Sequence, residues 1–437
     1  MPKENITTIG GPSTDAQVVR FDLTSLAVFL CGATSSVNLN LIGEVYVAEL
    51  LLIPLGMILL IRYGDNGVFT SRSFAFFILF GLITLSGYMI TDLVIGTRPS
   101  QYLRGWGRVC ILLSNIVFLM IIVARGRQYL WWFIIGMGMG GVTYLWIKGV
   151  PFSVWKLGYG EQVSFIVLTL SCILPKKLSI PLLVGFAILN IGLDYRNLAA
   201  VYLLVAGILW VRRSDSNNPI KGLKSFLGLG LAVALVVTIL AIGLSLTDKE
   251  YGDRRADSNA GRLAGIIVAI RAITDSPMIG YGSWSENEEY AKMIQDETRK
   301  REDPGRVRKA RQYGVKTFRA HSQILQPWVE GGILGAAFFL FYAYRLALGA
   351  RLFILIEPIH RFTAINLYFV ILGAWNLIAS PFGGGQRILI AITVAILASL
   401  ELKKKRSLLA GSETSHLDVK VVAERNDRVL QRRREKF

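Results

Sequence analysis

The chain has 437 residues, of which 53% are hydrophobic, and its mean hydropathy is +0.48. Because a globular domain of this length cannot hide so much apolar surface from water, the composition excludes a soluble protein and indicates a polytopic membrane protein. The formal net charge of +18 then reflects cytoplasmic loops and contacts with anionic lipid, which we prefer to binding of nucleic acid. Cys31, Cys110 and Cys172 all lie in apolar segments, and their spacing matches neither a disulfide framework nor a metal site.

Residues 1–21 are polar and lack the short apolar core and cleavage site of a removable signal peptide, so we expect a cytoplasmic tail. Twelve apolar runs follow, and most are long enough for a helix to cross roughly 30 Å of hydrocarbon. The predicted spans are residues 22–40, 42–61, 74–94, 107–124, 128–147, 161–175, 178–195, 197–211, 222–246, 322–344, 359–379 and 386–402. The sixth to eighth are close to the lower length limit for a crossing. The sequence therefore predicts an all-α polytopic membrane protein with about twelve transmembrane helices.

Lys and Arg residues orient these helices, because short basic loops stay in the cytoplasm. Placing the N-terminus inside puts nearly every basic short loop on the cytoplasmic side. The exceptions on the outer face are Arg98, Arg104, Arg108, Lys148, Lys156 and Arg196. The predicted order is a cytoplasmic tail (1–21), spans one to nine (22–246), an extracytoplasmic loop (247–320), spans ten to twelve (321–402) and a basic cytoplasmic tail (403–437).

The long extracytoplasmic loop contains one predicted amphipathic helix. Asp257 or Ser258 is a candidate N-cap for a helix from about Gly261 to Thr274, in which apolar residues recur at helical spacing. Asp-Ser-Pro at 275–277 ends this helix, which we expect to lie at the outer membrane interface. Residues 284–312 are so polar that they predict an exposed helix or a lid.

Histidine chemistry is restricted to one position on the outer face. The sequence has no Walker glycine loop, dinucleotide fingerprint or His-Glu-x-x-His pattern, which argues against an ATP motor, a nicotinamide cofactor and a zinc protease site. By the predicted topology His360 and His416 are cytoplasmic, whereas His321 stands where the charged loop meets an apolar helix, after nine Lys and Arg residues between Arg299 and Arg319. An imidazole with its ordinary pKa of about 6.5 can accept a proton near neutral pH. His321 is therefore a candidate general base, and the alternative is a histidine that anchors the helix at the headgroup level.

Two arginines are candidate ligands for an anion. Arg196 lies at the outer face between two apolar runs, where it marks either a functional site, a salt bridge to Asp194, or a side chain that reaches the headgroups. Arg262 falls in the first turn of the loop helix, where free backbone N–H groups and the helix dipole favour a bound anion and a guanidinium can grip phosphate oxygens. The alternative for Arg262 is an ordinary solvated charge.

Glu330 lies inside an apolar helix, where a carboxylate is costly unless it is paired or lines a polar cavity. Nine residues separate it from His321, which places the two on opposite faces of a straight helix unless Pro327 kinks it. We prefer Glu330 as the partner of an arginine to a direct catalytic role. Arg319, the last cation of the charged run, is a further candidate for a supporting role.

Four short motifs contain most of these residues. They are Gly-Arg at 261–262, Asp-Ser-Pro-Met-Ile-Gly-Tyr-Gly at 275–282, Ala-His-Ser-Gln-Ile-Leu-Gln at 320–326 and Glu-Gly-Gly-Ile-Leu-Gly at 330–335. Together they resemble the O-antigen ligase and O-antigen polymerase superfamily. The resemblance covers mainly residues 190–335 and agrees with the number of predicted spans and with the long loop before a late helix.

The resemblance implies an all-helical membrane fold akin to the C-type glycosyltransferases. It also implies transfer of a glycan from undecaprenyl pyrophosphate to an acceptor hydroxyl, without a metal or other cofactor. By this resemblance His321 accepts the proton of the acceptor, while Arg196 and Arg262 neutralise the leaving pyrophosphate and the anomeric centre is inverted. The chain departs from the family pattern at Tyr195, where a small residue is common, and at Ser322, where Asn is common.

Two functions share this chemistry, and a third belongs to another class. An O-antigen ligase, which we favour because the histidine and glycine motifs are closest to it, transfers the glycan to lipid A-core. An O-antigen or exopolysaccharide polymerase joins the glycan to a growing chain instead. A transporter or flippase of lipid-linked sugars would also have about twelve spans and intramembrane arginines, but the hydropathy shows no two matching halves. We expect the protein in the bacterial inner membrane, with its active site on the outer face.

Overall fold

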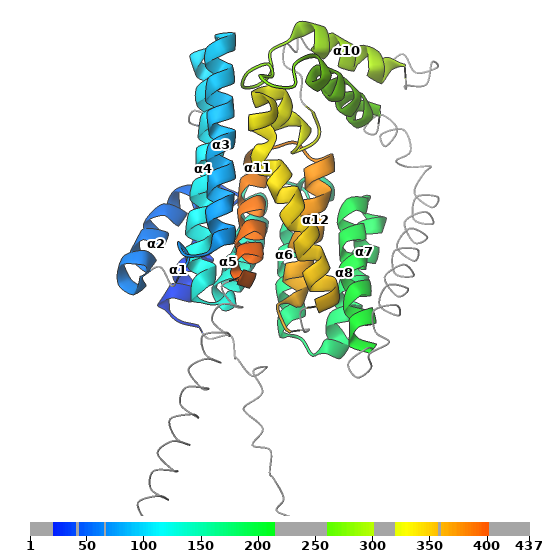
Figure 1. Ribbon diagram of the computed structural model, residues 1–437. Helices are drawn as coiled ribbons and strands as arrows, with labels where there is room; N and C mark the ends of the chain where they lie inside the picture. Colours follow the sequence, from blue (N-terminus) through cyan, green and yellow to red (C-terminus); the bar gives the residue numbers. More distant parts are fainter. Residues whose placement is uncertain are drawn as a thin grey trace, which may run out of the picture.

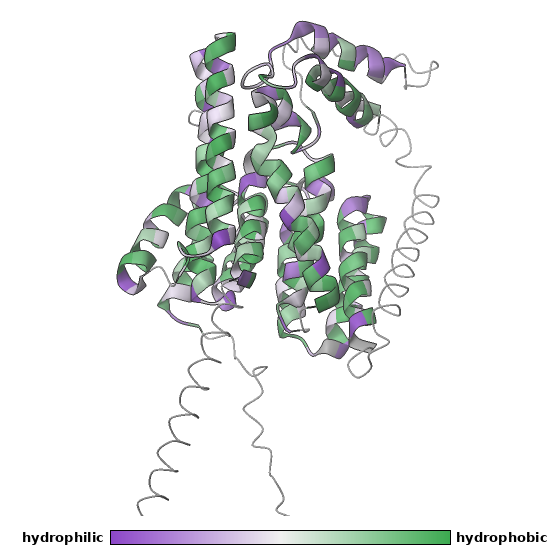
Figure 2. Ribbon diagram, in the orientation of Figure 1, coloured by the Kyte–Doolittle hydropathy of each residue, from purple (hydrophilic) through white to green (hydrophobic). Residues whose placement is uncertain are grey.

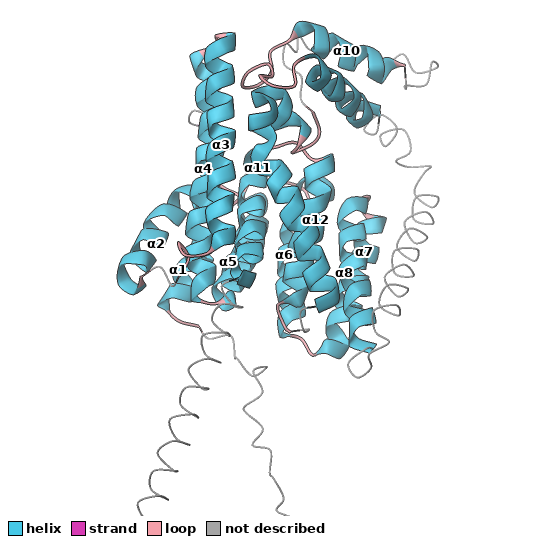
Figure 3. Ribbon diagram, viewed as in Figure 1, coloured by secondary structure: helices cyan, strands magenta, loops and turns pink. Residues whose placement is uncertain are grey.

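A computed structural model describes residues 21–40, 43–64, 67–214, 260–300, 320–356 and 360–401. Most of these residues are helical (Figures 1 and 3). Helices are expected in a lipid environment because they satisfy every backbone hydrogen bond internally. The predicted ninth span, the predicted caps of the loop helix and nearly all of both predicted tails lie outside the described residues.

The elements follow one another in the order expected from the apolar runs. The first part contains α1 (Leu23–Ala33), the strands β1 (Asn38–Asn40) and β2 (Glu44–Tyr46), α2 (Val47–Tyr63), α3 (Arg72–Ile95), α4 (Pro99–Arg125) and α5 (Arg127–Ile147). A short π-helix (Trp155–Tyr159) leads into α6 (Gly160–Ile173), α7 (Lys176–Gly192) and α8 (Arg196–Ser214). Residues 260–275 form a helix, which is followed by α10 (Glu288–Arg299). The last part contains α11 (Leu325–Arg351) with a π-helical end (Leu352–Ile356), α12 (Thr363–Ala379) and the helix Gly384–Glu401.

Five of the described helices are long and apolar enough to cross a membrane. They are α3, α4, α5, α11 with its π-helical end, and the helix Gly384–Glu401. Four shorter apolar helices of 10–17 residues are α1, α6, most of α7 and α12. Figure 2 shows how apolar residues dominate these helices, whereas α10 is largely polar. The chain is therefore a multi-pass membrane protein, and the total of twelve crossings stays a prediction.

One end of the molecule extends beyond the other helices. α3 and α4 run side by side up to the level of α10, past the ends of α7 and α8 (Figure 1). The helix over residues 260–275 and α10 lie at this end, which we call the loop end. α4 begins at Pro99, well before residue 107, so Arg104 and Arg108 lie inside the helix and not at its boundary as expected. Arg108 is also buried.

A short hairpin between α1 and α2 departs from the expected all-α fold. Its strands are antiparallel, with Asn38 opposite Tyr46. Arg387 pairs with Glu49 of α2 at 2.7 Å and donates a second hydrogen bond to the Glu44 carbonyl at 2.7 Å. The start of the helix Gly384–Glu401 therefore holds both the hairpin and the first turn of α2.

α1 and α5 approach so closely that their contact requires glycine. A Cβ atom at Gly136 would lie 2.2 Å from the Phe29 carbonyl oxygen, and one at Gly140 would lie 2.0 Å from that of Ala33. Lipid chains are as apolar as the helix surfaces, so close backbone packing of this kind is a main source of helix association in membranes.

Gly136→Leu is expected to separate α1 from α5, because the new side chain has no room against Phe29. Overpacking of this kind costs about 1–3 kcal/mol, and it should lower the unfolding temperature measured in detergent. Gly185→Leu in α7 is the matched control, since no atom lies within 4 Å of a Cβ atom there. Equal stability of the two variants would contradict the close packing of α1 on α5.

Candidate active site

His321 lies in an exposed position on a short turn directly before α11. The next residue, Ser322, donates from Oγ to the Leu377 carbonyl of α12 at 3.0 Å. The same oxygen accepts hydrogen bonds from the Ile324 and Leu325 N–H groups, both at 3.3 Å. Ser322 therefore stabilises the turn before α11 and fixes the histidine segment to the last turn of α12.

The helix over residues 260–275 carries Arg262 in its first turn, with the side chain partly exposed. This helix shares an apolar cluster with Ala320, the residue before His321, and with α10. The cluster consists of Val268, Ala269, Ala272, Tyr290, Ala291, Ala320 and Val329. The packing therefore brings the helix that carries Arg262 against the segment that carries His321.

Arg196 is the first residue of α8. Near the other terminus of α8, Arg212 donates a hydrogen bond to the Phe353 carbonyl, which follows the last turn of α11. Because α11 begins at the loop end, this contact places Arg212 at the opposite end of the molecule and Arg196 at the end of α8 that is directed toward the loop end. Arg196 Nε lies 3.6 Å from Oδ1 of the buried Asp194, so the salt bridge considered as the alternative for Arg196 is present.

Of the predicted site residues, His321 and Arg262 thus lie on two segments of the loop end that pack together, and Arg196 lies at the end of α8 that is directed toward them. Arg319 lies outside the described residues, and its supporting role stays a prediction. Within the described ranges, no group of three or more His, Cys, Asp or Glu side chains is placed to hold a metal ion.

α11 is broken near its start, at Gly331–Gly332, where the backbone angles are not helical. The break leaves two carbonyl groups without a partner in the helix, and the loop after residue 275 supplies the donors. Tyr281 N donates to the Val329 carbonyl at 2.8 Å, and Gly282 N donates to the Glu330 carbonyl at 3.0 Å. We call this contact, formed by residues 277–282 and 329–333, the loop–helix clasp. It joins two of the family-like motifs directly to each other.

Glycine is required on both sides of the clasp. Gly332 has a left-handed φ of +62°, and a Cβ atom there would lie 2.0 Å from the Met278 carbonyl oxygen. Gly280 has a φ of +80°, and its Cβ would lie 2.6 Å from the Val329 carbonyl oxygen. The glycines of both motifs therefore allow the two backbones to touch.

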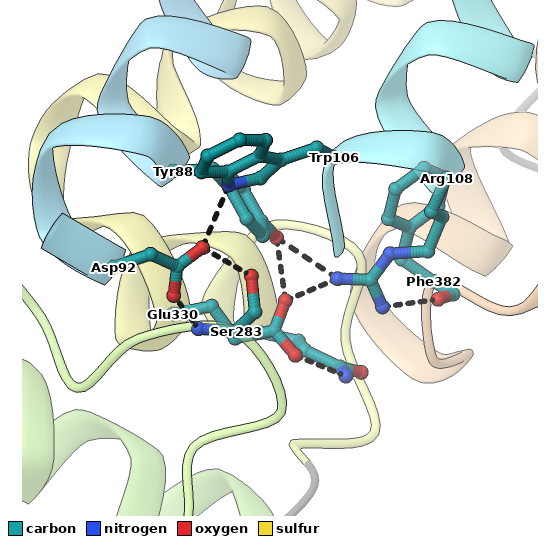
Figure 4. A network of polar contacts seen from close by, with 8 residues as sticks. Tyr88, Asp92, Trp106, Arg108, Ser283, Glu330 and Phe382 are labelled. Carbon is teal, nitrogen blue, oxygen red and sulfur yellow. Dashed lines mark hydrogen bonds and ion pairs between the residues drawn. The ribbon is translucent and has the colours of Figure 1, made fainter. Parts of the chain in front are cut away.

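A buried ion pair joins the clasp to the helices beneath it. Glu330 pairs with Arg108 of α4, and their side chains are 1% and 4% exposed. Tyr88 of α3 donates to Glu330 Oε2 at 2.5 Å and accepts from Arg108 Nη2 at 3.1 Å (Figure 4). Gln326 Nε2 donates to Glu330 Oε1 at 3.0 Å, and Arg108 Nη1 donates to the Phe382 carbonyl at 3.0 Å. Glu330 is thus the partner of an arginine, and these additional bonds offset the cost of burying both charges.

The straight-helix argument for Glu330 and His321 is wrong. α11 begins only at Leu325 and is broken at Gly331–Gly332, so no continuous helix joins the two residues. Pro327 lies in the first turn, where proline is tolerated because its N–H group would have no helical partner. The kink therefore falls at the glycines and not at the proline.

A second buried carboxylate ties the loop to α3 and α4. Asp92 Oδ1 accepts from Ser283 N at 2.6 Å (Figure 4). Asp92 Oδ2 accepts from Ser283 Oγ at 2.7 Å and from Trp106 Nε1 at 2.8 Å. Sequence reasoning did not single out Tyr88 or Asp92, nor Arg108 as a site residue. Their positions inside apolar runs could have indicated them, because polar and charged groups are costly there unless they are paired.

Tyr290 fixes α10 to the end of the helix over residues 260–275. Its hydroxyl donates to Asp275 Oδ2 at 2.6 Å and lies 2.9 Å from Tyr281 Oη. Burial, together with the hydrogen bonds to Asp275 and Tyr281, raises the pKa of Tyr290, so the hydroxyl stays protonated. The described part of the predicted lid, α10, is therefore docked on the loop.

Glu330→Ala should destabilise the protein strongly, because it leaves the Arg108 guanidinium buried without its carboxylate. Breaking one side of a buried pair costs roughly 3–5 kcal/mol, which thermal or denaturant unfolding in detergent can measure. Asp296→Ala is the matched control, since Asp296 pairs with Arg299 on the surface at 3.9 Å and such pairs contribute less than about 1 kcal/mol. A similar loss of unfolding free energy in the two variants would contradict a stabilising role of the Arg108–Glu330 pair.

A comparison with protein families matches residues 182–340 to the family described as O-antigen ligase. The matched region is less than half of the chain, and it contains Arg196, Arg262, His321, Glu330 and the whole clasp. Among curated proteins, none matches the chain significantly. Residues 182–340 are therefore similar to the O-antigen ligase family, and the resemblance of the motifs to the O-antigen ligase and O-antigen polymerase superfamily is confirmed.

Proposed function

We propose that this protein is an inverting, metal-independent glycosyltransferase of the O-antigen ligase type. It moves a glycan from undecaprenyl pyrophosphate to a hydroxyl of lipid A-core at the outer face of the bacterial inner membrane, with both termini in the cytoplasm. The O-antigen ligase domain supports a glycosyltransferase-like enzyme of O-antigen biosynthesis. The observation that carries the proposal is an exposed imidazole, His321, on a segment packed against the helix that carries Arg262.

In the proposed reaction, His321 accepts the proton of the acceptor hydroxyl while the hydroxyl oxygen attacks the anomeric carbon. The bond between that carbon and the pyrophosphate oxygen breaks, and its electron pair leaves with the pyrophosphate. Attack from the side opposite the leaving group inverts the anomeric centre. A general base contributes typically about 10²- to 10⁴-fold, and positioned cations in a poorly hydrated pocket contribute several kcal/mol at the transition state.

The two arginines suit the leaving group for different physical reasons. Arg262 stands in the first turn of its helix, where backbone N–H groups and the helix dipole add to the guanidinium charge. No carboxylate of the described chain pairs with Arg262. Arg196 has the buried Asp194 carboxylate 3.6 Å from its Nε, which holds the guanidinium at the start of α8.

His321→Ala is expected to lower the rate of glycan transfer by about 10²- to 10⁴-fold, the contribution of a general base. The measurement uses purified protein in lipid nanodiscs with undecaprenyl-pyrophosphate-linked glycan and lipid A-core, and thermal unfolding confirms that the variant is folded. His416→Ala, in the basic tail, should keep full activity. Normal product from His321→Ala would remove the base assignment.

A deletion strain should distinguish a ligase from a polymerase. Loss of a ligase leaves full-length polymer on its lipid carrier, and this is the outcome we expect. Accumulation of single repeat units on lipid would instead identify an O-antigen or exopolysaccharide polymerase. Gel analysis of the lipid-linked and lipopolysaccharide fractions separates the two outcomes. Protection of the donor across sealed vesicles without any transfer would favour a transporter.

A further inference from the structure

Three carboxamide side chains meet beside the segment that carries His321. Gln323 Nε2 donates to Gln386 Oε1 at 3.1 Å, and Asn376 Nδ2 donates to the same oxygen at 3.0 Å. The three residues come from the turn before α11, the end of α12 and the start of the helix Gly384–Glu401. We call them the amide cluster. Gln323 N also donates to the Leu377 carbonyl at 3.0 Å, so the cluster and the histidine segment share one support.

The amide cluster has hydrogen-bonding groups that the described protein does not use. Gln386 Oε1 accepts hydrogen bonds from two amides. Gln386 Nε2 therefore points away from Gln323 and Asn376. No acceptor for Gln386 Nε2 exists among the described residues. Gln386 is only partly buried. Gln323 is fully buried, and its Oε1 has no hydrogen-bond partner in the described chain.

Two of the three glycines before Gln386 leave open space, whereas a Cβ atom at Gly384 would lie 3.0 Å from Glu44 Oε2. A Cβ atom at Gly383 would have nothing within 4 Å, and one at the exposed Gly385 would meet only Tyr46 Oη at 3.6 Å. Arg108 Nη1 holds the preceding Phe382 carbonyl at 3.0 Å (Figure 4). The open surface beside Gln386 is therefore part of a rigid support.

The two buried arginines beside the amide cluster are already neutralised, and the exposed Glu44 carboxylate lies close to Gly384. Arg387, next to Gln386, pairs with the buried Glu49, and Arg108 pairs with Glu330. The cluster itself is uncharged. A pyrophosphate needs cations, which this surface does not offer, whereas carboxamides donate to and accept from sugar hydroxyls.

We propose that the amide cluster binds hydroxyl groups of the acceptor sugar and that Gln386 is its contact residue. This inference rests on the proposed function and adds to it the place of the acceptor. The acceptor sugar lies over residues 380–386, with one hydroxyl directed at His321. Gln323 and Asn376 act as positioning residues, because they hold Gln386 Oε1 and turn its N–H groups toward the sugar.

Gln386→Glu tests the site with little change in shape. The variant keeps an oxygen for the Gln323 and Asn376 donors but replaces the outward N–H groups by a second oxygen. With lipid A-core as acceptor and undecaprenyl-pyrophosphate-linked glycan as donor, the KM for the acceptor should rise about three- to tenfold, the effect of one lost neutral hydrogen bond. The KM for the donor and the unfolding temperature should stay unchanged. Gln386→Met, which removes both polar atoms, should show the same separation of the two KM values.

Gln295→Ala on the exposed face of α10 is the control, and both KM values should stay at the wild-type level. An unchanged acceptor KM in Gln386→Glu and Gln386→Met, with wild-type transfer intact and His321→Ala inactive, would overturn the acceptor site and leave the proposed function standing. A parallel rise in both KM values would also overturn it, since that result indicates a general structural role. Absence of transfer by the wild-type protein would overturn the proposed function and the acceptor site together.

Discussion

The loop–helix clasp is the interaction on which the arrangement of the loop end depends. A helix that breaks at membrane depth must find donors for its free carbonyl groups, because lipid supplies none. Here the Tyr281 and Gly282 N–H groups supply them to Val329 and Glu330. The break at Gly331–Gly332 is therefore stable only with the loop in place. The same contact sets where the helix carrying Arg262 stands relative to the start of α11.

Two buried ion pairs, Arg108–Glu330 and Arg387–Glu49, fix how the helices beneath the clasp pack. Charges of this kind are expensive in an apolar environment, and such a pair often adds little net stability compared with apolar residues of equal volume. An incorrect packing of these helices would leave one charge unpaired, which costs far more. The pairs therefore favour one arrangement of α2, α4, α11 and the helix Gly384–Glu401 over its alternatives. Tyr88 and Gln326 add to this preference, because their hydrogen bonds to Glu330 also require that arrangement.

The sequence predicts local features well and long-range pairings poorly. Apolar runs depend only on neighbouring residues, so each described span contains one helix, and the periodic apolar residues after Gly261 predict the loop helix closely. The first two predicted spans, 22–40 and 42–61, are too long, because they include the strands β1 and β2. The position of Glu330 in an apolar helix indicates that it needs an arginine. The identity of that arginine was out of reach, because Arg108 lies 222 positions away in the chain and its helix was expected to start later. The break at Gly331–Gly332 was missed for a related reason: two glycines permit a kink, but only contact with a distant loop makes the kink favourable.

The two sides of the loop end differ in how their arginines are paired. On the side of α3, α4 and the helix Gly384–Glu401, both buried arginines are neutralised by glutamates, and the groups beside them are the amide cluster and the exposed Glu44 carboxylate. On the other side, Arg262 has no carboxylate partner in the described chain, and its helix adds the positive end of a dipole. His321 stands on the segment between them, anchored to α12 through Ser322 and packed through Ala320 against the helix of Arg262. This arrangement supports the proposed reaction, in which an uncharged alcohol attacks and a polyanion leaves, because the polyanion has a lower free energy on the side of Arg262 than on the side where both buried arginines are paired with glutamates.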